Sequence, residues 1–115
     1  MTSEDKIQSD VYRWFNNNYC LNHHNPKGII FSVPNGGTRN IIEATKLKAT
    51  GLTPGVSDLI LIYNHKILFL ELKNEIGRQS TAQIQFQNAI TQNGFNYQIA
   101  YSLEQAKELI ITHFL

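Results

Sequence analysis

The amino-acid sequence predicts a mixed α/β (α+β) protein in which a four-stranded sheet is flanked by helices. Three observations predict this class. Several stretches repeat apolar residues at helical spacing, four short runs are rich in Ile, Leu, Val and Phe, and Gly, Pro or Asn separates most of them. Read in order, the segments give α-β-α-β-β-α-β-α. At 115 residues, the chain 1–115 is expected to be a single domain.

Four helices are expected. The first covers 3–19, with Ser3 as a candidate cap, because its apolar residues recur at spacings of three and four. These residues are Ile7, Val11, Trp14 and Phe15. The second helix covers 40–50 and stops at Gly51, and the third covers 80–93 and stops at Gly94. Ser102 and Gln105 have the spacing of a capping box, which predicts a last helix over 102–114.

The four expected strands cover 28–33, 58–63, 66–72 and 96–101. Only Asn64 and His65 separate the second run from the third, so these two strands form a hairpin. Both carry Ile and Leu on alternate faces. This pattern predicts central strands that are covered on both sides.

Composition excludes several classes of function. The net charge is +1, so no bulk basic surface points to nucleic acid, and any anion-binding surface must be local. A single cysteine, Cys20, allows neither an internal disulfide nor a cysteine zinc cluster and fits a reducing compartment. The longest apolar runs fall well short of the ~20 residues of a membrane span. Without a signal-peptide pattern either, the protein is expected to be cytoplasmic.

Three charged residues lie at the ends of two otherwise apolar strands. Asp58 opens one strand, and Glu71 and Lys73 close the other. Because side chains alternate along a strand, Glu71 and Lys73 point to the same face. A hairpin centred on 64–65 places Asp58 across from this end of its partner. Two carboxylates and a lysine are therefore expected to cluster at one edge of an apolar sheet.

This cluster suits a divalent cation. Hard cations such as Mg²⁺ take oxygen ligands, usually one or two carboxylates with waters and substrate phosphates. The ion can activate a bound water and neutralise charge on a phosphate. A lysine can hold or deprotonate that water, or stabilise the charge that develops. The residues alone leave a second interpretation open, in which Asp58 ends a loop and Glu71 and Lys73 are solvated charges or a salt bridge.

The surrounding sequence resembles the VRR-NUC nuclease domain, a branch of the PD-(D/E)XK superfamily of metal-dependent nucleases. The resemblance runs from Glu4 to the last strand and joins several motifs in one order. It is carried by PNGGTRN, IIEATKLKATGLTPGVSDLILIY and LFLELKNEIGRQSTAQIQFQ. It implies a restriction-endonuclease-like core. In one departure, Ser57 stands where the family has a proline before the acid.

The resemblance implies roles for individual residues. Asp58, Glu71 and Lys73 match the catalytic acid and the Glu-x-Lys motif, and Gln83 matches a glutamine that orients the water or the lysine. The metal ligands implied are Glu4, Asp58, Glu71 and the main-chain carbonyl of Leu72. The metal would be Mg²⁺ or Mn²⁺.

The resemblance also implies a DNA-binding surface. The loop Asn35, Gly36, Gly37 and Arg39 matches a family stretch, and its amides and arginine are expected to contact phosphates. The alternative for this stretch is a structural turn with a surface arginine. Further cations that could add to a local basic surface are Lys46, Lys48 and Arg78.

Taken together, the family implies a Mg²⁺- or Mn²⁺-dependent endonuclease. It further implies a homodimer that acts on branched DNA such as Holliday junctions, and a chain of the short stand-alone type found in phages and bacteria. One alternative is a non-catalytic DNA-binding or assembly subunit that retains the fold. Another is a restriction-type enzyme with sequence specificity, although nothing in the sequence looks like an added recognition domain.

Overall fold

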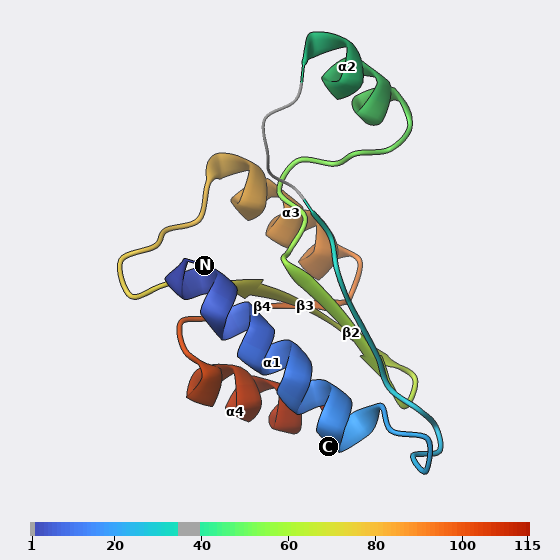
Figure 1. The fold of residues 1–115 in the computed structure, drawn as a ribbon. Helices are drawn as coiled ribbons and strands as arrows, with labels where there is room; N and C mark the ends of the chain where they lie inside the picture. Colours follow the sequence, from blue (N-terminus) through green and yellow to red (C-terminus); the bar gives the residue numbers. More distant parts are fainter. Residues whose placement is uncertain (1, 35–39) are drawn as a thin grey trace.

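The computed structural model describes residues 2–34 and 40–115. Figure 1 shows a sheet with helices on both faces and one helix standing away from the rest. The elements in chain order are α1 (Ser3–Tyr19), β1 (Ile29–Ser32), α2 (Ile41–Ala49), β2 (Leu59–Tyr63), β3 (Lys66–Leu72), α3 (Thr81–Gln92), β4 (Asn96–Ala100) and α4 (Leu103–Phe114). This is the predicted order and class.

The sheet has four strands in the order β1-β2-β3-β4. The first three are antiparallel neighbours, and β4 runs parallel to β3 after a crossover through α3. The predicted hairpin is present, since Tyr63 pairs with Lys66 across the turn. Both turn residues, Asn64 and His65, have left-handed backbones with φ of 50° and 66°. Asn tolerates this conformation better than most residues, which helps to fix the register.

The hydrophobic core lies between the sheet and the pair α1 and α4. Alternate residues of the central strands point into it, among them Leu61, Leu68 and Leu70, which are fully buried. From the helices, Phe15 of α1 and Ile110 of α4 meet them. The opposite face carries α3, which packs mainly on β4 and meets the sheet through an edge-to-face contact of Phe86 with Phe69.

One predicted feature differs from the structure. The apolar pattern of β2 predicts cover on both faces, but in the described part of the chain helices cover only the face toward α1 and α4. Ile60 and Ile62 on the other face are only half-buried, because α3 lies toward β4 and α2 projects away from the sheet (Figure 1). A strand pattern reports that both faces are apolar, but not what covers them.

The helix boundaries follow local chemistry. Thr2, rather than Ser3, caps α1 in a capping box with Asp5. Ser80 caps α3 in a capping box with Gln83. Ser102 caps α4 as predicted, but the Gln105 side chain accepts from the Tyr101 N–H, so the full capping box is not formed. Gly51 follows α2 with φ of 113°, a conformation that favours glycine. Among the residues that the structure describes, no helix combines the length and apolar character needed to cross a bilayer.

Candidate active site

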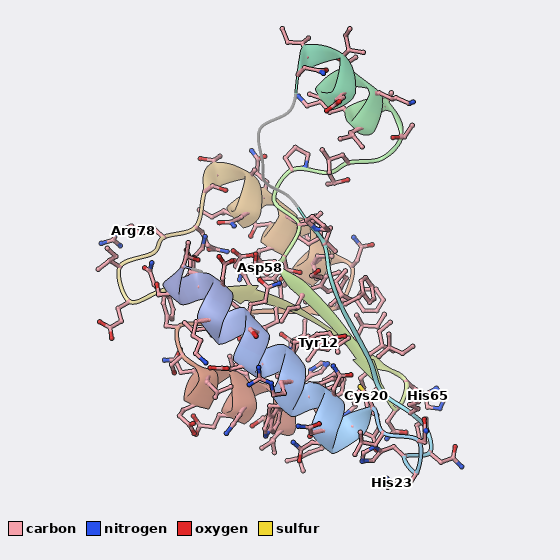
Figure 2. All side chains as sticks on the ribbon, in the orientation of Figure 1. Tyr12, Cys20, His23, Asp58, His65 and Arg78 are labelled. Atoms are coloured by element: carbon pink, nitrogen blue, oxygen red, sulfur yellow. The ribbon has the colours of Figure 1, made fainter. Side chains whose placement is uncertain are left out.

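The carboxylates of Asp58 and Glu71 lie together where β2 begins and β3 ends. Each bonds to the main chain of the other strand. The Leu72 N–H donates to Asp58 Oδ2 at 2.8 Å, and the Asp58 N–H donates to Glu71 Oε1 at 3.2 Å. The Leu59–Leu70 register places Asp58 opposite Glu71. The structure therefore brings the two acids together as the hairpin predicts (Asp58 is labelled in Figure 2).

Lys73 and Gln83 complete the cluster from one side. The Lys73 Nζ lies 3.3 Å from Glu71 Oε2, and the Gln83 Nε2 donates to the same oxygen at 2.7 Å. Glu71 is 2% exposed and Lys73 12% exposed, so neither is a solvated strand-end charge. The turn at Gly77 lies against the lysine stem, since a Cβ there would be 3.2 Å from Lys73 Cβ and Cδ. The four residues predicted to be catalytic thus form one cluster.

The first turn of α3 fixes the orientation of the Gln83 amide. The Gln83 N–H donates to the Ser80 hydroxyl at 3.2 Å, and the Ser80 N–H donates to Gln83 Oε1 at 2.9 Å. With its oxygen held by this capping box, the amide directs its NH₂ group at Glu71. The capping sequence of the helix therefore also orients a residue of the site.

The loop before Asp58 passes directly across the start of α3. Gly55 has φ of 86°, and a Cβ there would overlap the main-chain carbonyl of Ala82. Only glycine allows this approach. Ser57, the residue in place of the family proline, is fully buried, and its hydroxyl donates to the Leu59 main-chain oxygen at 3.2 Å. These contacts hold Asp58 and Gln83 on neighbouring elements.

Burial raises the pKa of both carboxyl groups. For Glu71, burial and then the charge of Asp58 raise the pKa to about 7, against the lowering effect of Lys73. Burial likewise raises the pKa of Asp58, although the Leu72 N–H and Lys73 lower it. One lysine therefore does not offset two buried carboxylates, and further positive charge at the pair would be stabilising.

The acidic residues of α1, Glu4 and Asp5, make no hydrogen bond to the Asp58–Glu71 cluster among the described residues. Glu4 is half-buried on the stripe of α1 that also carries Ile7 and Val11, facing the core side of the sheet. Asp5 is the acid of α1 whose charge acts on Asp58, raising its pKa, while its own carboxylate accepts from the Thr2 N–H. Within residues 2–34 and 40–115, no three His, Cys, Asp or Glu side chains group closely enough to hold a metal ion. The structure does not bring Glu4 into such a group.

The direction of the Leu72 carbonyl follows from the hydrogen bonds of the main chain around it. In a strand, the N–H and C=O of one residue point to the same side. The Leu72 N–H donates to Asp58, whereas the Lys73 N–H donates to Ala100 on the β4 side. The Leu72 carbonyl therefore faces the edge that carries Asp58.

The predicted DNA-binding residues are scattered. Asn35, Gly36, Gly37 and Arg39 lie outside the described residues. Lys46 and Lys48 are exposed in the last turn of α2. Arg78 is exposed in the loop between β3 and α3 and is labelled in Figure 2. These three cations lie on two separate segments, the last turn of α2 and the loop between β3 and α3.

Sequence reasoning did not predict two supports of the site. One is the close contact of Gly55 with α3, for which a glycine two positions before a buried serine is a weak signal. The other is a hydrogen bond of 2.8 Å from Gln79 Nε2 to Gln87 Oε1, which ties the loop after β3 to α3 one turn beyond Gln83. Because Gln87 lies one helical turn after Gln83, the spacing indicates that Gln87 is on the side of α3 that faces the site.

Two solved structures share this architecture over nearly the whole chain. One, described as a "VRR_NUC domain protein", has a TM-score of 0.76 at 21% identity and covers 98% of this chain and 88% of its own. The other, described as a "VRR_NUC domain", has a TM-score of 0.67 at 20% identity and covers 99% and 100%. This chain has the VRR_NUC fold.

The resemblance carried by the sequence motifs is therefore confirmed at the level of architecture. No protein-family model and no curated protein sequence matches the chain. The site residues therefore have to be argued from their own geometry.

Proposed function

We propose that this protein is a divalent-metal-dependent nuclease that hydrolyses phosphodiester bonds in DNA. The observation that carries the proposal is the pair of the buried Glu71 and the half-buried Asp58, joined by Lys73 and Gln83 at one end of the sheet. A binding module gains nothing from two buried carboxylates with raised pKa values, since phosphates are anions. Perturbed acids beside a lysine are typical of a catalytic site.

The residues fit Mg²⁺ or Mn²⁺. Asp58 and Glu71 supply hard carboxylate oxygens, and the Leu72 carbonyl faces the same edge, which meets the usual need for one or two carboxylates plus neutral oxygens. Glu4 is proposed as a further ligand on the resemblance alone. When bound, the ion would acidify a water and neutralise charge on the scissile phosphate.

The remaining residues act on the proton and on orientation. Lys73, whose Nζ lies 3.3 Å from Glu71 Oε2, would as an ammonium orient the attacking water or stabilise charge at the phosphate, and as a neutral amine would accept the water's proton. Gln83 holds Glu71 Oε2 and so fixes the direction in which that carboxylate presents its oxygens. Lys46, Lys48, Arg78 and the loop of Asn35, Gly36, Gly37 and Arg39 would hold the DNA backbone.

We extend the proposal to a homodimer in the cytoplasm that selects branched DNA, such as Holliday junctions. Two-fold symmetry would present two active sites to two strands of a junction. This part rests on the family resemblance.

The test compares the intact protein with Asp58→Asn on linear duplex, single-stranded, flap and four-way junction DNA, with and without Mg²⁺ or Mn²⁺. We expect metal-dependent cleavage by the intact protein and loss of at least about 10³-fold of it in the variant, with DNA binding retained. Asp10→Asn is the matched control, because Asp10 pairs with Lys6 on α1 away from the cluster. Binding without cleavage of any substrate would favour the non-catalytic subunit. Discrete bands from mixed duplex DNA would favour a restriction-type enzyme.

A further inference from the structure

The part of one sheet face formed by β1 and β2 carries apolar side chains that no helix in the described residues covers. Ile29 and Phe31 of β1 are 51% and 42% exposed, and Ile60 and Ile62 of β2 are half-buried. They alternate with core residues such as Leu61, so they point to the face opposite α1 and α4. We call these four residues the open sheet face. Contiguous exposed apolar patches are uncommon on soluble monomers and mark interaction sites.

Helix α2 carries exposed apolar side chains that could pack on such a face. Ile41 and Ile42 are 84% and 80% exposed, and no residue of the helix is buried. Figure 1 shows α2 projecting from the sheet, where it packs extensively on no other helix or strand. Helices this short are marginal in water without tertiary packing. Among residues 2–34 and 40–115, no helix or strand packs extensively on α2.

We propose that α2 of one copy packs on the open sheet face of a second copy, and that the exchange is reciprocal. The inference rests on the homodimer proposed above and gives that dimer an interface. Each chain carries both an uncovered apolar face and an apolar helix without a support. A two-fold axis satisfies both at once, because each copy supplies what the other lacks.

Area and charge are consistent with a second copy of this chain. With a side-chain area on the order of 200 Å² each, Ile29, Phe31, Ile41 and Ile42 expose roughly 500 Å² per copy, hence about 1,000 Å² in a dimer before any polar rim is counted. The net charge of +1 opposes association only weakly. DNA is a poor occupant, because the open sheet face offers no cation to phosphates.

The first experiment measures the mass of the protein in solution across a concentration series. We expect a dimer, and we expect Ile42→Asp and Phe31→Asp each to raise its dissociation constant at least about tenfold. Ile76→Asp is the matched control, because Ile76 is 87% exposed in the turn after β3 and lies outside both surfaces. A monomer at about 100 μM, or a dimer that neither interface variant weakens, would overturn the proposal.

The second experiment tests the exchange itself in a Cys20→Ser background. One preparation carries Ile42→Cys and the other Phe31→Cys, with tags of different mass, and the two are mixed and oxidised. We expect a disulfide between position 42 of one chain and position 31 of the other. Links only between like positions would show a different packing and overturn the reciprocal arrangement.

Cleavage measured on the same samples separates the two proposals. A dimer linked in this way that cleaves no DNA would contradict the nuclease and support the interface. Cleavage by a strictly monomeric protein would support the nuclease and contradict the interface.

Discussion

Glu71 is buried where β3 ends, and its ionisation should be visible in the stability of the metal-free protein. Its pKa is about 7 in the folded chain, against an ordinary 4.5. Because folding raises this pKa, the protonated acid stabilises the fold. The contribution is complete below about pH 4.5 and is lost as the pH rises to about 7. Its size is on the order of 3 kcal/mol.

We therefore expect the unfolding temperature in EDTA to fall across this window and Glu71→Gln to remove most of the fall. Thermal unfolding of both proteins at a series of pH values measures the difference in unfolding temperature between them. The titration of distant groups such as His113 is common to both proteins and cancels in this difference. Glu104→Gln, at an 84% exposed acid of α4, is the control. Parallel pH curves for the intact protein and Glu71→Gln would show that burial does not perturb this carboxyl group.

Gln83 gives a second prediction at the scale of one residue. Gln83→Glu keeps the oxygen that accepts from the Ser80 N–H but loses the donor to Glu71 and adds a third acid to the cluster. We expect α3 to stay capped and single-turnover cleavage to fall about 10- to 100-fold, as for residues that orient metal ligands. A shift in the Mg²⁺ concentration needed for half-maximal rate should accompany the loss. Gln85→Glu, exposed on the same helix, should change neither quantity.

Some of the site follows from the sequence and some does not. The tight Asn64–His65 turn fixes which residues lie opposite each other, so the adjacency of Asp58 and Glu71 is a local property that the spacing predicts. The burial of Glu71 is not local, because it depends on α3 closing over the end of β3. For the same reason, strand ends alone could not distinguish a salt bridge in solvent from the buried cluster.

At the scale of elements, the site depends on how closely the loop before β2 approaches α3. Gly55→Ala should add about 1 kcal/mol of backbone strain and also a clash with the Ala82 carbonyl, for a total of about 3 kcal/mol or more. Gly94→Ala separates the two effects, because Gly94 has φ of 84° but no atom within 4 Å of the added Cβ. Denaturant unfolding measures both, and equal losses would show that the loop can move away from α3.

Helix α2 marks the limit of sequence reasoning at this scale. Asn40 and Gly51 indicate where the helix begins and ends, and the structure agrees. Neither residue indicates that the helix projects away from the sheet. Its placement depends on which apolar surfaces are free to pack against it, and the local sequence of α2 does not contain that information. The apolar pattern of β2 predicts cover on a face that no helix in the described part of the chain covers. The exposed apolar residues of α2 and the sheet face without helix cover are complementary surfaces. The proposed interface explains both.

At the scale of the whole molecule, the charge distribution decides how DNA could be held. A net charge of +1 gives little long-range attraction, so affinity must come from a few cations near the site. The described candidates, Lys46, Lys48 and Arg78, lie on two separate segments, α2 and the loop between β3 and α3. Binding through separate contacts should be weak, independent of sequence and strongly dependent on salt.

The lysines of α2 should contribute measurably to the salt dependence of DNA binding. If Lys46 and Lys48 each contact a phosphate, changing either to glutamine should lower the slope of log affinity against log salt by about one on duplex DNA. The loss of affinity should be the same for unrelated sequences. Fluorescence anisotropy with the cleavage-deficient Asp58→Asn protein measures both quantities without degrading the DNA. Lys107→Gln is the control, because Lys107 lies over Trp14 on the α1 and α4 side. An unchanged slope in both α2 variants would mean that this helix does not contact the DNA backbone, and α2 would then be left with the protein interface as its role.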